Sequence, residues 1–260
     1  MTSLLDKLNK YNDIIVNRHG LSGDSYMITR KIIDEINPLN TYKISKNGLE
    51  IEKSVNSFES VNSLYSTIPE YYEFEGKWLK DSNIHFTNNI NDANILGGFC
   101  KFEIDLDAMQ IPIQIATENN LLYYGCKLLK IDDTIKFNTE DNLPLSIIGV
   151  GKDYVNDYIL QEQYGGGMYL EYHKNPHFHM PYNMSSNGYI MFAKKIDDDK
   201  YHISAFKIPY GYAIYTPPYV LHNDCFLVGK YYVIYSKSEP FSTCLVRNKN
   251  DELIYMKLYE

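Results

Sequence analysis

The sequence predicts a mainly β protein in which a β-barrel domain follows an N-terminal extension. Short runs rich in Val, Ile, Tyr and Phe recur after Phe99, and Asn, Asp, Gly and Pro separate them, as is typical of strands joined by turns. No helical pattern of convincing length interrupts these runs, so we expect a sandwich or barrel. The expected strands cover residues 102–106, 111–115, 145–150, 188–193, 201–206, 231–235 and 253–256.

The first part of the chain has a different pattern. Apolar residues follow helical spacing over residues 4–15 and again over residues 27–36, which predicts two amphipathic helices. Residues 41–95 carry many Asn, Ser and acidic side chains with few clean periods, which favours short strands and loops packed on the barrel. We therefore divide the chain into an N-terminal α/irregular extension, residues 1–95, and a barrel domain, residues 96–260. The helices could cap the barrel, bind a partner or form a dimer interface.

Composition excludes several classes of partner. A chain of 260 residues with 44% hydrophobic and 22% charged residues can bury a sizeable core. Its 25 lysines and arginines against 33 acidic residues leave a net charge of −8, which argues against nucleic acid as a partner. The sequence has no apolar run of the roughly 18 residues that a membrane-spanning helix needs, and no signal-peptide pattern. We expect a cytoplasmic protein without a nucleic-acid or membrane partner.

The four cysteines are scattered along the chain. Cys100, Cys126, Cys225 and Cys244 form no Cys-x-x-Cys pair, so neither a zinc knuckle nor a disulfide scaffold is indicated. We expect four reduced, partly buried thiols.

Most of the histidines lie in one stretch, between Gly165 and Ser236. His177 and His179 form a His-x-His pair after a triple glycine, a short strand and a Pro turn. In a strand both side chains would point to the same side, about 7 Å apart along the chain. His222 follows a β-rich run that breaks at a Pro-Pro pair. Two neighbouring imidazoles and a third from a later strand predict a metal site with an open position, which is typical of catalytic metals.

A fourth ligand would come from Glu171 or His173. Positions 171, 173, 177 and 179 are all odd, so a strand that continues through the Pro176 turn would hold all of them on one face. The turn could equally change the face on which the odd-numbered residues after it lie. Three histidines with or without a carboxylate suit Fe(II), Mn(II), Ni(II), Cu(II) or Zn(II), and the sequence does not choose among these ions.

The remaining histidines are given no role in the site. His202 follows an acidic loop near the start of an expected strand, so we expect it to be solvated. His19 and His85 have no companions in the sequence. Any single histidine is more often a hydrogen-bonded core or surface residue than a ligand, and it is the joint spacing of the three candidate ligands that favours a metal.

Glu171 carries the chemical hypothesis. A carboxylate inside an apolar, tyrosine-lined barrel has a raised pKa unless it meets a cation, and it can then exchange protons near neutral pH. If Glu171 does not bind the metal, it would act as a general base. If it binds the metal, it would act as a ligand. The alternative is a surface-facing glutamate paired with Lys174.

Tyrosines near the histidines could line a site for a small polar ligand, and an aromatic core explains most of them equally well. Tyr182 and Tyr215 are our candidates for moving a proton beside Glu171. The sequence contains no dinucleotide or phosphate-loop pattern and no nucleophile elbow. The tyrosines in question are Tyr169, Tyr182, Tyr189, Tyr212, Tyr215 and Tyr219.

These motifs resemble the cupin superfamily over roughly residues 100 to 240. Cupins combine His-x-His, followed by Glu, with a later Gly, five residues, Pro and a His five positions past that Pro. Gly211, Pro217 and His222 match the second motif in spacing. The resemblance implies a jelly-roll barrel, a double-stranded β-helix, with a divalent metal ion held by His177 and His179 with His222.

The chain departs from the cupin pattern at three positions. Asn183 stands four residues past His179, where cupins have the Glu, and no other Glu follows within reach. Glu171 replaces the glycine expected six residues before His177. Tyr219 replaces the glycine usual two residues past the Pro.

A narrower likeness links residues 110–235 to ureidoglycolate lyases. Residues 113–130 resemble the opening segment of that family, and Leu170 to His173 resembles its Leu-Glu-x-His. Ser204 to Phe206, with Gly211 to His222, resembles its Ala-Phe, Gly and terminal His. The lyases lack His-x-His at this place, so shared architecture alone could explain the likeness.

From these residues we expect a metal-dependent enzyme that acts on a small polar metabolite. The ion would polarise a carbonyl or hydroxyl oxygen while Glu171 or a tyrosine moves the proton, as in a lyase or isomerase. The lyase likeness implies C–N or C–O cleavage on a small carboxylate. An iron-dependent dioxygenase and a non-catalytic ligand-binding barrel stay open as alternatives, and a homodimer is expected because cupin barrels often pair through strands.

Overall fold

The protein is mainly β in a computed structural model, which describes residues 10–11, 15–52, 65–79, 99–236 and 240–260. The one α-helix among the labelled elements is short: α2 (Glu118–Tyr123), which begins with a capping box between Thr117 and Asn120. A π-helical turn covers Val155–Ile159. The strands are β1 (Asn17–His19), β2 (Tyr26–Ile36), β3 (Tyr42–Ser45), β4 (Gly48–Ile51), β5 (Tyr72–Leu79), β6 (Phe99–Ile104), β7 (Ala108–Ile115), β8 (Lys127–Lys130), β9 (Thr134–Ile135), β10 (Leu143–Val150), β11 (Tyr169–His173), β12 (His177–Pro181), β13 (Asn187–Gly188), β14 (Ile190–Lys195), β15 (Lys200–Lys207), β16 (Tyr212–Thr216), β17 (Leu221–Asn223), β18 (Leu227–Ile234), β19 (Pro240–Asn248) and β20 (Tyr255–Tyr259).

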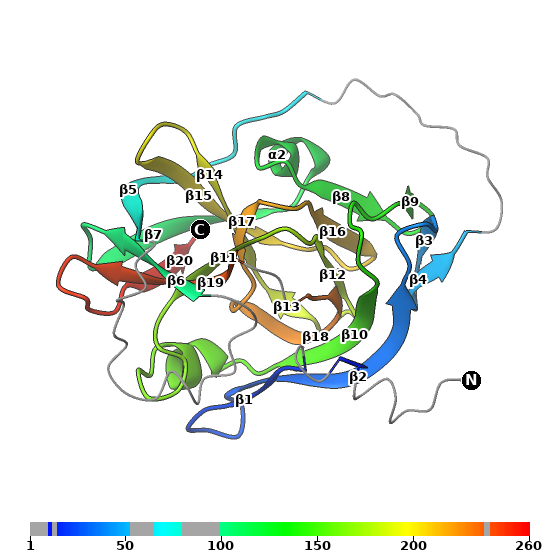
Figure 1. Ribbon diagram of the computed structural model, residues 1–260, viewed down its shortest axis with the longest axis horizontal. Helices are drawn as coiled ribbons and strands as arrows, with labels where there is room; N and C mark the ends of the chain where they lie inside the picture. Colours follow the sequence, from blue (N-terminus) through cyan, green and yellow to red (C-terminus); the bar gives the residue numbers. More distant parts are fainter. Residues whose placement is uncertain (1–9, 12–14, 53–64, 80–98, 237–239) are drawn as a thin grey trace.

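The strands form two large sheets and a small one (Figure 1). The open sheet has the order β1-β2-β10-β18-β12-β16-β8. In the other large sheet, β14-β17-β11-β19-β6-β5-β15 closes on itself because β14 also pairs with β15, which gives a closed mixed barrel of 7 strands. The pair β19–β6 is parallel, and the other pairs around this ring are antiparallel. We call this ring the closed barrel. This architecture is compatible with a cupin-like jelly roll, and the mainly β prediction is confirmed.

The predicted helix over residues 27–36 is wrong, because these residues form β2. This strand pairs with β10, and the register shifts twice, so that Arg30 and Ile33 have no partner in the ladder. Each such bulge adds one residue to the two-residue alternation of a strand. Two bulges so close together give the apolar residues the three- and four-residue spacing of a helix. The other predicted helix, over residues 4–15, lies almost wholly outside the described residues.

Strands from the N-terminal part complete both large sheets. β2 lies between β1 and β10 in the open sheet, and β5 lies between β6 and β15 in the closed barrel. The described residues before position 96 therefore contribute strands rather than a helical cap. Division of the chain at residue 95 stays a prediction.

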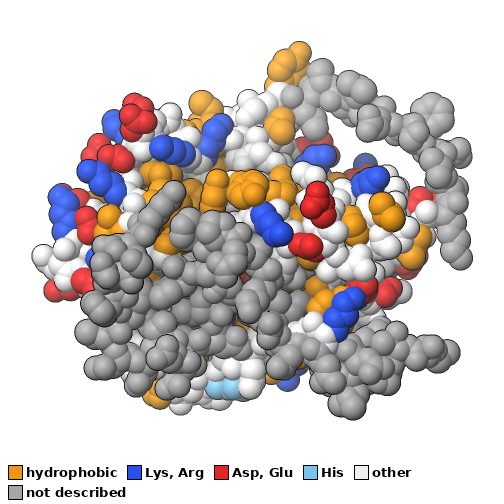
Figure 2. All heavy atoms as spheres, viewed as in Figure 1, with side chains coloured by type: hydrophobic (Ala, Val, Ile, Leu, Met, Phe, Trp, Pro, Cys, Tyr) orange, Lys and Arg blue, Asp and Glu red, His pale blue; other side chains and the backbone are white. Residues whose placement is uncertain are grey.

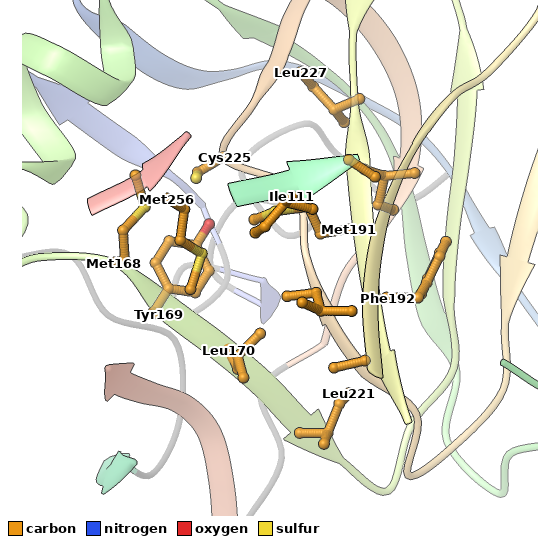
Figure 3. Packing of buried hydrophobic residues seen from close by; sticks show 14 of the residues in the cluster. Ile111, Met168, Tyr169, Leu170, Met191, Phe192, Leu221, Cys225, Leu227 and Met256 are labelled. Atoms are coloured by element: carbon orange, nitrogen blue, oxygen red, sulfur yellow. The ribbon is translucent and has the colours of Figure 1, made fainter. Parts of the chain in front are cut away.

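Two hydrophobic cores lie on opposite faces of the open sheet. The larger core joins the open sheet to the closed barrel, and Figure 3 shows part of it, with Ile111, Leu170, Met191, Leu221 and Met256 gathered from different strands. The smaller core lies between the open sheet and the sheet β4-β3-β9, and it contains Phe137, Phe178 and Tyr215. Strand β12 has His177 and His179 on the first face and Phe178 on the second, as alternation requires.

The expectation of four reduced thiols is wrong. Cys100 and Cys244 form a disulfide between the neighbouring parallel strands β6 and β19, where the two residues are register partners with Cα atoms 4.5 Å apart. Cys126 and Cys225 are buried free thiols. The bridging cysteines are 144 residues apart in sequence, and only the pairing of these strands brings them together.

Among the described residues, no helix is long and apolar enough to span a membrane. The cytoplasmic location stays a prediction.

Candidate metal centre

Four buried or nearly buried side chains meet where the two large sheets face each other. Glu171, His173, His177 and His222 each offer one ligand atom, and these atoms all lie within 4.8 Å of one another. We call this group the Glu/His cluster. The Glu171 side chain is 12% exposed, and the His177 and His222 side chains are 4% and 1% exposed.

Strand pairing explains why these residues meet. Glu171 on β11 lies directly opposite His222 on β17, so their side chains project from the same face of the sheet. His173 shares this face two residues further along β11. The chain then turns through Lys174 to Pro176 into β12, which belongs to the open sheet and begins with His177. The cluster therefore bridges two sheets.

Two of the imidazoles are oriented by backbone carbonyls. His173 Nδ1 lies 2.7 Å from the Asn175 oxygen, and His222 Nδ1 lies 2.8 Å from the Val220 oxygen. A carbonyl oxygen only accepts hydrogen bonds, so both Nδ1 atoms must donate, and a neutral ring then carries its lone pair on Nε2. Histidines that bind metals are held in this way by their outer nitrogen. Both Nε2 atoms are thus prepared to act as ligands.

The cluster also contains polar atoms that the protein leaves unsatisfied. His222 Nε2 lies 2.9 Å from His177 Nδ1 and 3.0 Å from Glu171 Oε2. His173 Nε2 and His177 Nε2 are buried without a hydrogen-bond partner. Each such atom costs about 1–3 kcal/mol. A divalent ion would satisfy nitrogen and oxygen atoms of this kind, so the cluster fits a first-row metal.

Burial sets the protonation of the cluster. Burial and the nearby charge of His222 lower the pKa of His173 to about 3. Burial and the neighbouring imidazoles also hold the pKa of His177 well below its usual value, so both rings are neutral at pH 7, as metal binding requires. Burial alone would lower the pKa of His222, but Glu171 raises it. Burial raises the pKa of Glu171, and its interaction with His222 partly offsets this effect.

His179 lies outside the Glu/His cluster, next to it. Its Nε2 atom lies 3.3 Å from Oδ2 of Asp224, and Asp224 also accepts hydrogen bonds from Tyr169, at 2.9 Å, and from Tyr235. Burial alone would raise the pKa of Asp224, but the bonds from His179, Tyr235 and Tyr169 hold it well below its usual value. The buried carboxylate thus fixes His179 away from the ligand atoms.

A small cavity adjoins the cluster. Its volume is about 10 Å³, enough for roughly one ion or water molecule. Arg18 lines it together with Glu171, His173, His177 and Asp224. The Arg18 guanidinium donates to the Tyr154 hydroxyl at 3.0 Å, and the residue is buried.

Sequence reasoning missed Arg18 and Asp224. Val16 and Arg18 are buried while Asn17 between them is exposed, so recognition of β1 as a strand would have placed Arg18 inward. Asp224 stands two residues past His222, which alternation also places inward.

The structure brings together three of the four candidate histidines and Glu171, but not the candidate tyrosines. Tyr215 lies opposite Phe178 and belongs to the smaller core, on the far side of β12 from His177. Tyr182 packs against the same core, with its ring 5.1 Å from that of Tyr232. Neither residue lines the cavity at the cluster.

Two other expectations are corrected. Glu171 is not a surface partner of Lys174, which pairs with Asp141 at 3.7 Å. His202 is buried rather than solvated, with Nδ1 2.7 Å from the Tyr123 hydroxyl and Nε2 3.2 Å from Glu73. His85 lies outside the described residues.

Comparison of the chain with known protein families, with curated proteins and with solved structures finds no match.

Proposed function

We propose that this protein is a metal-dependent enzyme of the cupin type that acts on a small polar metabolite. Glu171, His173, His177 and His222 would hold one first-row divalent ion, such as Fe, Mn, Ni or Zn. The observation that supports this most directly is the orientation of His173 and His222, whose Nδ1 atoms contact backbone carbonyls while Nε2 turns to the cluster. An ordinary core histidine also pairs one ring nitrogen with a carbonyl, but here the second nitrogen of both rings lies among other potential ligand atoms.

Lyase or isomerase chemistry suits this arrangement. When bound, a divalent ion supplies Lewis acidity that polarises a carbonyl or hydroxyl oxygen. Arg18 in the cavity wall provides a permanent positive charge, which favours a substrate with a carboxylate. Asp224 holds His179 and Tyr235 in place beside His177, whose ring lies 5.1 Å from that of Tyr235. The likeness to ureidoglycolate lyases suggests C–N or C–O cleavage on such a carboxylate.

A second candidate is a barrel that holds a metal ion at the Glu/His cluster without turnover. The volume of the cavity, about 10 Å³, favours it, because a metabolite would need a larger space than this structure shows beside the cluster. The two functions make the same prediction for metal binding and differ in turnover.

Elemental analysis tests the shared part of the proposal. We expect one first-row metal per chain in untagged protein prepared without chelators, and none in a folded His177→Ala/His222→Ala variant. His202→Ala is the matched control, because His202 is also buried and bonded to a carboxylate but lies outside the cluster. Absence of metal from the native protein, even after reconstitution, would contradict both functions.

Turnover separates the two functions. The metal-loaded protein is assayed with ureidoglycolate and related small carboxylates, before and after chelation. Cleavage that stops on chelation and returns with the ion supports the enzyme. Metal binding with no turnover of any of these carboxylates supports the non-catalytic barrel.

A further inference from the structure

A second, larger pocket lies at one end of the closed barrel. Its volume is about 610 Å³, which is in the range of small-molecule sites. Its lining residues come from the ends of β5, β11 and β14 and from the beginnings of β6, β15 and β17. Helix α2 closes one side. The Cys100–Cys244 disulfide contributes to its wall through Cys100.

This pocket is separate from the Glu/His cluster, although both use β11 and β17. Tyr172 and Leu221 line the pocket, whereas their sequence neighbours Glu171, His173 and His222 belong to the cluster. Successive residues of a strand point to opposite faces, so the two sites lie back to back across the same strands.

The walls of the pocket are mainly aromatic. Several of the polar groups on these rings already have partners within the protein. Trp78 Nε1 donates to the Tyr201 hydroxyl at 3.1 Å, and the Tyr124 hydroxyl lies 2.6 Å from Ser204 Oγ. The Tyr123 hydroxyl is bonded to His202. The rings therefore present apolar surface, which suits a flat ring by stacking and edge contacts. The aromatic lining residues are Trp78, Tyr123, Tyr124, Tyr172, Tyr201 and Tyr219.

The charged residues in the described lining of the pocket are both lysines. Lys194 and Lys195 line the pocket at the end of β14, and the described lining residues include no carboxylate. Lys194 Nζ lies 4.2 Å from the centre of the Tyr123 ring, so the ammonium group is held over an aromatic wall. In the region of the β14–β15 hairpin, Figure 2 shows lysine or arginine side chains above a band of hydrophobic side chains, with acidic side chains toward the tip of the hairpin. A ligand with an anionic group would complement this rim.

Tyr219 is held in an unfavourable backbone conformation at the mouth of the pocket. Its φ angle is +62°, in the left-handed region that favours glycine and penalises a bulky side chain. Its N–H donates to the His173 oxygen at 2.8 Å, and its ring lies 5.5 Å from that of Tyr172 while the residue stays 55% exposed. Glycine would fit this backbone better, so the aromatic ring itself has a use there.

We propose that this pocket binds a small aryl carboxylate, with its ring against the aromatic wall of Trp78, Tyr172 and Tyr219 and its carboxylate at Lys194 and Lys195. This site is independent of the metal and of the proposed enzymatic function.

The test uses 2-naphthoate as the probe and 2-naphthalenemethanol as its uncharged counterpart. Trp78 is the one tryptophan of the chain and lines the pocket, so its fluorescence reports occupancy directly. We expect saturable one-to-one binding of 2-naphthoate with a dissociation constant on the order of 0.1 mM. The uncharged alcohol should bind at least about fivefold more weakly.

Two variants test the roles of the lysines and of the Tyr219 ring. Lys194→Gln/Lys195→Gln should abolish the preference for the acid. Tyr219→Gly should weaken binding about 3–10-fold without lowering the melting temperature, since it removes a ring and relieves the backbone. Tyr259→Ala is the control for loss of a surface tyrosine, and His177→Ala should leave binding unchanged. The proposal is overturned if no saturable binding occurs at millimolar probe, if acid and alcohol bind equally, or if both pocket variants bind like the native chain.

Discussion

Glu171 and His222 are register partners on antiparallel strands, and Oε2 of the first lies 3.0 Å from Nε2 of the second. This pairing supplies the carboxylate that the chain lacks at Asn183. The carboxylate reaches the histidines from six residues before His177 rather than from four residues after His179. Three imidazoles and one carboxylate that could hold a metal ion are thus assembled from the consecutive strands β11 and β12 and from β17.

Replacement of Glu171 tests this assignment. Glu171→Gln removes the negative charge but keeps the shape, so we expect the affinity for Zn²⁺ or Mn²⁺ to fall at least about tenfold in isothermal titration calorimetry. Glu73→Gln is the matched control, because Glu73 also contacts a buried histidine, His202, outside the cluster. If the Glu171 variant and the native protein bind the metal with equal affinity, Glu171 is not a ligand.

His177 and His179 should respond differently to the same substitution. In His177→Gln we expect metal to be lost, because this imidazole is a member of the Glu/His cluster. In His179→Gln we expect one metal per chain to remain while the free energy of unfolding falls by about 1–3 kcal/mol, since Asp224 loses a buried partner. Metal content and urea denaturation of the two variants provide the comparison. Loss of metal from both variants would restore the simple His-x-His site, and retention of metal by the His177 variant would remove His177 from the site.

Asp224 should contribute stability that depends on pH. Its folded pKa lies below its usual value, so its ionised form stabilises the fold above about pH 4, and this contribution is lost as the pH falls toward the folded pKa. The Asp224→Asn variant lacks this contribution, so its free energy of unfolding at pH 7 should be lower by about 3 kcal/mol. The difference between the two proteins should shrink below about pH 4. Asp105→Asn, at an exposed ion pair with Lys249, should change stability by less than about 0.5 kcal/mol.

The disulfide should be visible in a count of thiols. Unfolded without reductant, the protein should expose two thiols per chain, from Cys126 and Cys225, and reduction should raise the count to four. Cys100→Ala/Cys244→Ala should lower the free energy of unfolding by about 2–5 kcal/mol, because the bridge closes a long loop. Four thiols before reduction would show that the bridge is absent in solution.

The sequence predicts the barrel well because its strands after Phe99 are short, β-rich and separated by turn residues. β2 could not be predicted as a strand, because two bulges disguise its alternation. The disulfide was equally invisible, since pairing of β6 with β19 depends on closure of the whole barrel.

The candidate site was predictable in part. Alternation along a strand points to Glu171, His173 and His177, which are close together in the sequence. The spacing of a motif points to His222. Which of them meet depends on register and on the turn through Pro176, and these place His173 in the cluster and His179 beside Asp224. Tyr182 and Tyr215 were misplaced relative to the cluster because sequence alone does not tell which face of a strand is turned to which core.

The bond between Cys100 and Cys244 makes a covalent ring of the chain between them, and all members of the Glu/His cluster belong to that ring. A protease that cuts one peptide bond inside the ring would leave a single covalent molecule, and the two pieces would separate on a gel only after reduction. A cut between β5 and β6 would instead release β1 to β5 as soon as the protein unfolds, because these strands are joined to the ring only through the main chain.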